Sequence, residues 1–264
     1  MKGRMAAEEV ADVKERSGGI AAFFDLDGTL VARPSLERRF FRMMRYRRAI
    51  PAKNYFLWLR EAAGMALRGI GRMLQANKMY LRGILADRWG ESGLSPAPPF
   101  FENGLKRIAW HARKRHLIVI VSGTLVPLAQ AAARTLESEL ATRGTFPAIR
   151  VCATRLEEID GLWTGKILGE AMFGEAKARA AKKIALERKL DLAHCYAYGD
   201  SADDRWLLAA VGRPFVVNPS ADLARFAETL GWPALSWAGI ENEAQRRRVR
   251  KEDVEKKVLP RLLA

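Results

Sequence analysis

Two aspartates stand two residues apart in the stretch FFDLDGTLV, at the end of an apolar run. Asp25 and Asp27 are followed directly by Gly28 and Thr29. Positions two apart in a strand face the same side, and two close carboxylates repel each other unless a cation lies between them. The two carboxylates of such a pair can take different roles in phosphoryl transfer. One is ionised, binds Mg²⁺ and attacks phosphorus, while the other protonates the leaving oxygen and then activates water. The alternative is a strand that ends in an ordinary polar turn.

A second polar group, VSGT, closes a later apolar run with Ser122, Gly123 and Thr124. A hydroxyl followed by glycine and the start of a helix suits a phosphate oxygen, because the side chain and nearby backbone N–H groups can all donate to it. Ser and Thr also cap helices routinely, so capping remains an alternative. Gly28 similarly allows a sharp turn that brings backbone N–H groups toward a phosphate.

The remaining candidates are one lysine and three acids in GEAKARA and YGDSADD. Lys177 lies in the first turn of an expected helix, where a cation is mildly unfavourable, which indicates a role beyond solubility; a solvated surface lysine is the alternative. Asp200 ends an apolar run beside a glycine, where a hard cation can find a carboxylate. Asp203 and Asp204 open the next helix, where acids are favoured by capping alone.

The elements that position these residues follow from the apolar pattern. Runs that are apolar throughout and alternate with helical stretches predict an α/β fold with three layers, in which a Rossmann-like parallel sheet is covered on both faces. Ligands in such sheets bind beyond the carboxyl ends of the strands, where the candidate residues stand. An Asp-Gly pair within 154–168 predicts a short hairpin. The expected strands are 20–25, 116–123, 148–154, 194–200 and 213–218.

One segment interrupts the alternation of strands and helices. Residues 34–102 show helical stretches without a strand-like run, and 33–102 hold 14 Lys and Arg against 5 Asp and Glu, a net charge of +9. We predict an inserted α-helical cap domain at 34–102. The catalytic core is then discontinuous, and the ends of the chain are peripheral, helical or frayed: core 18–33 and 103–240, ends 1–17 and 241–264.

The overall charge is +15, with a pI of about 10.2, which favours anionic partners such as phosphates, nucleic acid or acidic lipid. The N-terminal stretch lacks a secretory apolar region, and no run of about eighteen apolar residues occurs, so we expect a cytoplasmic protein. The three histidines match no metal site and are expected at the surface or in caps. The run RRRVRK is expected to be a solvated face, and no specific nucleic acid is expected as a partner.

Taken together and in this order, the motifs DLDGT, VSG, an isolated lysine and GDSxxD resemble the haloacid dehalogenase-like (HAD) superfamily of phosphotransferases. The resemblance runs from about residue 20 to 235 and includes VVNP and GWP after the last motif. A helical insert between the first two motifs is similar to the phosphoserine-phosphatase-like branch, subfamily IB. The resemblance implies a HAD fold with a cap and a Mg²⁺-dependent phosphatase.

The resemblance also implies a role for each candidate residue. Asp25 would become an aspartyl-phosphate, and Asp27 would serve as general acid and base and lend its backbone carbonyl to the metal. Ser122 and the amide of Gly123 would hold the phosphoryl oxygens. Lys177 would neutralise the charge shared by nucleophile and phosphate.

The implied metal ligands are completed by the last acidic motif. Asp200 would bind Mg²⁺ directly, Asp204 would support it directly or through water, and Asp203 would stand beside them. The chain departs from true phosphoserine phosphatases, which carry a glutamate soon after the first motif for the substrate's amino group. Here the position nine residues after the first aspartate is Pro34, next to Arg33, which disfavours phosphoserine.

Three functions stay open from the sequence. The first is a Mg²⁺-dependent phosphomonoesterase for an anionic phosphorylated metabolite. The second keeps this chemistry but places the basic cap on an anionic membrane, where a phospholipid or lysophospholipid headgroup is the substrate. The third is a basic nucleic-acid-binding protein on the same scaffold. The oligomeric state is not predicted.

Overall fold

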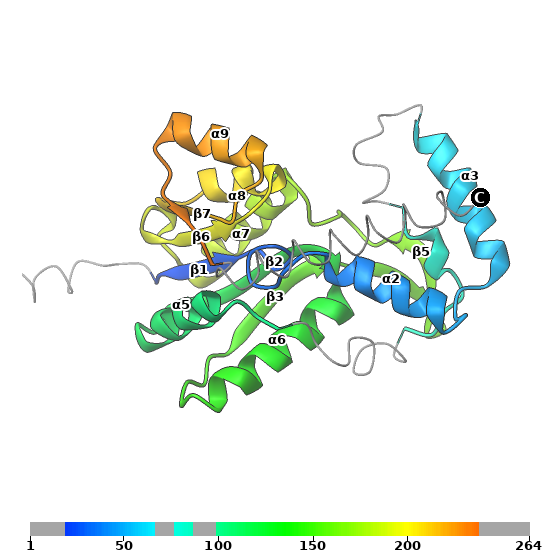
Figure 1. Ribbon diagram of the computed structural model, residues 1–264, viewed down its shortest axis with the longest axis horizontal. Coiled ribbons are helices and arrows are strands. Elements are labelled where there is room, and N and C mark those ends of the chain that lie inside the picture. The colour runs from blue at the N-terminus through cyan, green and yellow to red at the C-terminus, as the bar shows by residue number, and fades with distance from the viewer. Residues whose placement is uncertain (1–18, 67–76, 87–98, 238–264) are drawn as a thin grey trace, which may run out of the picture.

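The central sheet of the computed structural model, which describes residues 19–66, 77–86 and 99–237, has six parallel strands. Their order is β3-β2-β1-β6-β7-β8, with β1 between β2 and β6 (Figure 1). All five predicted strands are confirmed, whereas β8, with two residues, is too short to leave a pattern. The bounds are β1 (Ala21–Phe24), β2 (Leu117–Leu125), β3 (Ile149–Thr154), β6 (Tyr196–Gly199), β7 (Arg213–Val217) and β8 (Ala234–Leu235).

Helices cover both faces of this sheet. Because side chains alternate along a strand, Ala22 and Phe24 pack into the cluster formed with α5 and α6, while Ala21 and Phe23 pack into the cluster formed with α7, α8 and α9. Figure 1 shows α5 and α6 below the sheet and the other three helices above it. The predicted three-layer α/β fold is confirmed. The helices are α5 (Glu102–Arg113), α6 (Val126–Ala141), α7 (Glu175–Arg188), α8 (Arg205–Ala209) and α9 (Ala221–Leu230).

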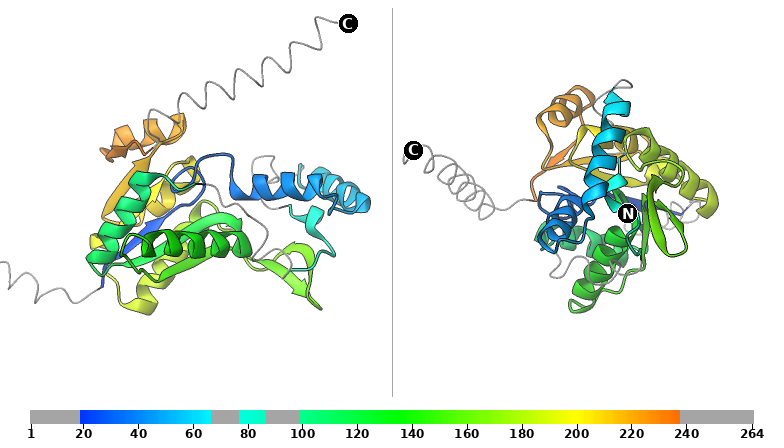
Figure 2. Two further views of the ribbon diagram at one scale, coloured as in Figure 1. Left: turned by 60° about the horizontal axis from the view of Figure 1, so that its bottom comes forward. Right: turned by 90° about the vertical axis from the view of Figure 1, so that its right-hand side faces the viewer.

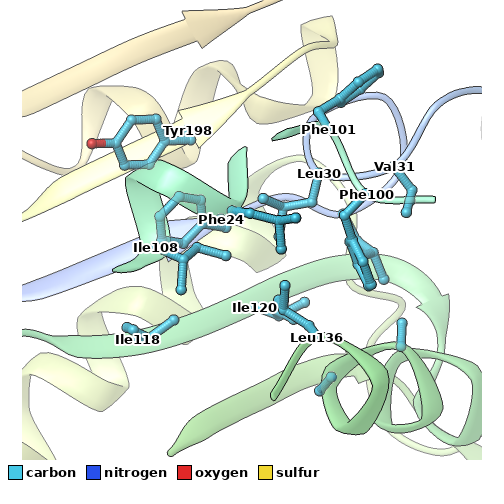
Figure 3. Close-up of a cluster of buried hydrophobic side chains, with 14 of the residues drawn as sticks. Phe24, Leu30, Val31, Phe100, Phe101, Ile108, Ile118, Ile120, Leu136 and Tyr198 are labelled. Atoms are coloured by element: carbon cyan, nitrogen blue, oxygen red, sulfur yellow. The ribbon is translucent and has the colours of Figure 1, made fainter. Parts of the chain in front are cut away.

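The core beneath β1 fixes the strand end that carries the first aspartate. Phe24 is fully buried and stacks on Tyr198 of β6, with ring centroids 4.5 Å apart and planes 8° from parallel. Ile108, Ile118 and other apolar side chains surround the pair (Figure 3). Burying an aromatic side chain of this size stabilises the fold by about 1.5–3 kcal/mol, so the end of β1 has little freedom to shift.

His111 lies inside this core, which corrects the expectation that the histidines are surface or capping residues. Its side chain is fully buried, with Nε2 2.9 Å from the Tyr198 hydroxyl and Nδ1 2.8 Å from Nδ1 of His116. Burial, together with the nearby charges of His116 and Arg107, lowers the pKa of His111 to about 3. The imidazole is therefore neutral in the folded protein.

A buried neutral histidine makes the stability of the fold depend on pH. Unfolding restores the ordinary pKa of about 6.5, so the unfolded state binds the proton more tightly and the free energy of unfolding falls as pH drops below about 6.5 toward 3. We expect the His111 contribution to fall by about 2 kcal/mol between pH 7 and pH 5. Urea unfolding of the wild type and of His111→Gln at both pH values checks this. Equal pH dependence of the two proteins would contradict it.

The inserted segment contributes α2 (Leu36–Tyr46), α3 (Ala52–Ala66) and the 3₁₀ helix η1 (Met79–Leu81). Helix α2 begins where the Ser35 side chain accepts a hydrogen bond from the Arg38 N–H, a helix cap, and it buries Leu36, Phe40 and Met44 along one stripe. Figure 2 shows α2 and α3 extending away from the end of the sheet. The parts 67–76 and 87–98 of the predicted cap lie outside the described residues.

The predicted hairpin is confirmed as β4 (Leu156–Ile159) and β5 (Leu162–Ile167). Asp160 and Gly161 both have positive φ, 51° and 74°, as a two-residue primed turn requires. The hairpin pairs with the inserted segment, because the Gly83 N–H donates to the Trp163 carbonyl at 2.7 Å and the Trp163 N–H donates to the Ile84 carbonyl at 2.9 Å. Side chains of the inserted segment, such as Phe40, and of the hairpin, such as Trp163, therefore share one hydrophobic cluster.

The predicted peripheral ends, 1–17 and 241–264, lie outside the described residues. Among the helices that the structure does describe, none has the length and apolar character needed to cross a membrane.

Candidate functional site

A cavity of about 680 Å³ lies at the carboxyl ends of β1, β2 and β6, facing the inserted segment. Six of the seven predicted site residues line it, and Asp204 lies beneath them as a fully buried side chain. The strand ends and the insert therefore enclose one space. The lining residues from the predicted set are Asp25, Asp27, Ser122, Gly123, Lys177 and Asp200, with Asp203 at the same cavity.

Lys177 is buried between two aspartates. Its Nζ lies 2.5 Å from Oδ1 of Asp25 and 2.6 Å from Oδ1 of Asp204. Burial raises the pKa of Asp25 well above its ordinary value, against the lowering effect of Lys177, and Asp204 and Asp200 raise it further. The pKa of Lys177 is raised, because the two carboxylates outweigh the opposing effect of burial. The structure thus excludes the alternative of a solvated surface lysine.

Asp204 also caps the turn that follows β6. Its second oxygen, Oδ2, accepts hydrogen bonds from the N–H of Asp200 at 3.1 Å and from the N–H and hydroxyl of Ser201, each at 2.9 Å. A side chain at Gly199 would place its Cβ 2.4 Å from Cβ of Asp204, so only glycine fits there. The Asp204 carboxylate therefore both caps the turn after β6 and accepts a hydrogen bond from Lys177.

Asp200 is paired with an arginine that the sequence did not single out as a site residue. Arg33 places Nη2 2.6 Å and Nε 3.2 Å from Oδ2 of Asp200. Burial and the charge of Asp204 raise the pKa of Asp200 to about 6, although Arg33 lowers it. At Gly28, with φ of 99°, a Cβ would lie 2.0 Å from the same Asp200 oxygen. Glycine is needed here for close packing against the acid as well as for the turn.

Asp27 points toward the inserted segment. Its Oδ1 accepts a hydrogen bond from the Leu36 N–H at 2.7 Å, at the first turn of α2. Burial raises the pKa of Asp27 to about 6, opposed by this hydrogen bond and by Lys177. The two acids of DLDGT thus have different surroundings, since Asp25 is held by an ammonium and Asp27 is not in contact with one. The contact with Lys177 therefore distinguishes Asp25 from Asp27.

Ser122 and Gly123 lie within β2, which continues to Leu125 before α6 begins at Val126. The helix expected after this motif is α6, and its N-cap position is Leu125, so neither Ser122 nor Thr124 caps it. The strand carries both residues to the cavity: Ser122 is buried and lines it. A Cβ at Gly123 would lie 2.0 Å from the Phe173 ring, so a larger residue would displace that ring from the cavity wall.

The buried acids fit a divalent cation. One oxygen from each of Asp25, Asp200 and Asp204 lies within 4.8 Å of the other two, and all three side chains are buried. With Asp27, four carboxylates face Lys177 and Arg33, which leaves a net charge of −2 when all are ionised. Carboxylate oxygens are the ligands that Mg²⁺ and Ca²⁺ prefer, so the donor set is suitable for a hard divalent ion.

The inserted segment supplies a second set of cavity residues that sequence reasoning missed. Oε1 of Glu37 accepts hydrogen bonds from Lys78 Nζ at 2.5 Å and from the Tyr80 hydroxyl at 3.0 Å. The Phe41 ring meets the Tyr80 ring edge-to-face at 5.1 Å. A lone glutamate in a strongly basic helix was the available signal, but its partners are more than forty residues away. The set comprises Glu37, Arg38, Phe41, Trp58, Asn77, Lys78 and Tyr80.

Known proteins match the chain over most of its length. The family model of the haloacid dehalogenase-like hydrolases matches residues 22–209. A probable phosphatase of Mycobacterium tuberculosis is 31% identical over 232 residues, which cover 83% of this chain and 75% of that protein. A phosphoserine phosphatase of the same organism is 28% identical over 222 residues, covering 80% of this chain and 69% of that protein.

A solved structure shares the fold. It is a phospho-aspartyl intermediate analogue of phosphoserine phosphatase, with a TM-score of 0.55 and 19% sequence identity. The match covers 83% of this chain and 93% of that structure. At this identity the likeness concerns the arrangement of the elements.

Proposed function

Because the chain belongs to the haloacid dehalogenase-like hydrolase family and is a phosphoric monoester hydrolase of phosphoserine-phosphatase-like type, we propose that it works through an aspartyl-phosphate on Asp25 with Mg²⁺ as cofactor. One observation carries this proposal: the buried Asp25 carboxylate ends β1 at the cavity and is held there by Lys177 at 2.5 Å. A positioned carboxylate beside a fixed cation is suited to nucleophilic attack on a phosphate.

The proposed reaction has two steps at phosphorus. A carboxylate oxygen of Asp25 attacks, the bond from phosphorus to the substrate oxygen breaks, and that oxygen takes the proton of Asp27. A water molecule then gives a proton to Asp27 and attacks the same phosphorus, which releases phosphate and restores the carboxylate. Burial raises the pKa of Asp27 to about 6, closer to neutral pH than an ordinary carboxyl group, which suits a residue that both gives and takes a proton.

The phosphoryl group is held by residues of β2 and α7 in this proposal. The Ser122 hydroxyl and the Gly123 amide donate to its oxygens, and the absence of a side chain at Gly123 allows close approach. Lys177 neutralises the charge that the nucleophile and the phosphate share. Donors fixed in place before the reaction stabilise charge in the transition state without reorganising.

We propose Asp25, the Asp27 carbonyl and Asp200 as metal ligands, with Asp204 as direct or water-mediated support and Asp203 beside them. The cluster of three buried acids and its excess negative charge support a divalent ion. When bound, Mg²⁺ supplies charge stabilisation to the transferring phosphoryl group.

We further propose residues 34–102 as a cap over a catalytic core formed by 18–33 and 103–240. The hairpin within 154–168 joins the cap side through its pairing with the insert. Residues of the insert and of the strand ends line one cavity, which supports a cap that excludes water during phosphoryl transfer.

The proposed substrate is a small anionic phosphorylated metabolite in the cytoplasm. Arg33 and Arg38 at the cavity support an anionic substrate. A phospholipid or lysophospholipid at an anionic membrane is the second candidate, because Phe56 and Leu59 are exposed one turn apart on the basic insert, 68% and 59%. The third alternative, a non-catalytic nucleic-acid-binding protein, is disfavoured, because the matched family is one of hydrolases and a relative is named a probable phosphatase.

The test is turnover of p-nitrophenyl phosphate and of a panel of phosphometabolites that includes lysophosphatidate. We expect hydrolysis that falls at least about 100-fold on chelation of divalent ions and returns with Mg²⁺, because the acid cluster then lacks its counter-charge. Released phosphate is measured. Full activity in chelator would contradict the metal assignment, and no turnover of any panel member would contradict the phosphatase.

A further inference from the structure

The inserted segment forms one wall of the cavity, here called the roof, with Glu37, Arg38, Phe41, Trp58, Asn77, Lys78 and Tyr80. The roof contains a buried ion pair that the proposed chemistry does not use. Lys78, at the start of η1, is 2% exposed, and its Nζ lies 2.5 Å from Oε1 of Glu37 on α2. The Tyr80 hydroxyl donates to the same oxygen at 3.0 Å. All three residues line the cavity. The pair therefore faces the space in which the substrate's leaving group must lie.

This pair decides which charge the roof presents. Glu37 is the one acid that the described part of the insert contributes to the cavity lining, and alone it would attract an ammonium group. Lys78 of the same chain already forms an ion pair with the Glu37 carboxylate. With Glu37 neutralised, Arg38 remains as roof charge, so the leaving group meets a positive surface. A second ammonium would lose water and find no free carboxylate there.

We propose that Lys78 takes the place of a substrate ammonium, so that the enzyme selects phosphomonoesters whose leaving group is uncharged or anionic and discriminates against those that carry an ammonium. This inference rests on the proposed phosphatase function. The aromatic rings of Phe41, Trp58 and Tyr80 on the same roof add an apolar surface for the body of the leaving group.

A matched pair of substrates tests the selection. O-phosphoserine and 3-phosphoglycerate share one skeleton and differ in carrying an ammonium or a hydroxyl at the same carbon. We expect wild-type kcat/KM to be lower for O-phosphoserine. Lys78→Ala both removes the internal ammonium and opens space beside Glu37, so the ratio of the two kcat/KM values should rise at least about 10-fold in favour of O-phosphoserine.

Two further variants separate charge from folding. Glu37→Gln/Lys78→Ala should lose the rise, because no carboxylate remains to receive the ammonium. Lys78→Met removes the charge but keeps most of the buried side-chain volume, so it should raise the ratio by a smaller factor than Lys78→Ala, and it serves as the test variant if Lys78→Ala does not fold. Lys182→Ala, an exposed lysine on α7, is the matched control and should leave the ratio unchanged.

The outcomes separate this inference from the proposed function. A ratio unchanged in both Lys78 variants, or a wild type that prefers O-phosphoserine, would overturn the inference. Turnover of p-nitrophenyl phosphate, which carries no ammonium, tests the phosphatase itself: its failure in the wild type counts against the proposed function.

Discussion

Asp25→Asn is expected to abolish turnover of p-nitrophenyl phosphate, with kcat falling at least about 10⁴-fold. Asparagine has the same shape as aspartate, and its amide oxygen can still accept the hydrogen bond from Lys177 that Asp25 accepts at 2.5 Å. An amide is a far weaker nucleophile than a carboxylate, so only the covalent step is removed. Phosphate release measures the loss, and mass spectrometry of acid-quenched protein should find the phosphoenzyme in the wild type alone.

The same variant should fold at least as stably as the wild type. Asp25 is buried close to Asp200 and Asp204, and removing one negative charge relieves repulsion, whereas Lys177 keeps its partner Asp204. Thermal unfolding checks this. Asp222→Asn, an exposed acid in an ion pair with Arg225 on α9, is the matched control and should change neither property. Activity of Asp25→Asn at the wild-type level would rule out the aspartyl-phosphate.

Lys177→Met is expected to damage both catalysis and stability. In the wild type, Nζ of Lys177 lies 2.5 Å from Oδ1 of Asp25 and 2.6 Å from Oδ1 of Asp204. The variant leaves both carboxylates buried without this shared cation. Removing one partner of a buried pair costs about 3–5 kcal/mol of unfolding free energy. Loss of the charge that stabilises the transferring phosphoryl group should lower kcat by about 10²–10³-fold. Urea unfolding and steady-state kinetics measure the two effects.

The double variant Asp25→Asn/Lys177→Met shows whether the stability loss comes from the unpaired carboxylates. With one of them neutral, it should be more stable than Lys177→Met alone, because residues in contact do not act additively. Lys182→Met, exposed on the same helix, controls for the loss of a lysine as such. Equal stability of the single Lys177 variant and the wild type would contradict the structural part of this assignment.

Local pattern was sufficient to predict the sheet and the residues at its edge. Apolar runs such as 20–25 and 194–200 can be buried on both faces only in a covered sheet, and parallel strands bring their carboxyl ends to one edge. Asp25, Ser122 and Asp200 therefore converge as expected, each at the end of its strand or within the strand's last residues. Their proposed catalytic roles remain predictions.

Other features depended on packing between distant parts of the chain. His111 was expected at the surface or in a cap, but the packing of α5 against the sheet buries it beside Tyr198. The Asp-Gly turn predicted the hairpin, but its pairing with Gly83 and Ile84 depends on where the insert lies. Neither position leaves a periodic signal, because each is set by the docking of elements rather than by their formation.

The sequence by itself determined the parallel sheet, the hairpin and the order of acids, hydroxyl and lysine along the chain, since these follow from neighbouring residues. Only the tertiary structure decided the partners: Lys177 with Asp25, 152 residues away, Arg33 with Asp200, 167 residues away, and Lys78 with Glu37, 41 residues away. The physical reason is that the charge of a buried group depends on what packs against it, and that is known only once the elements have docked.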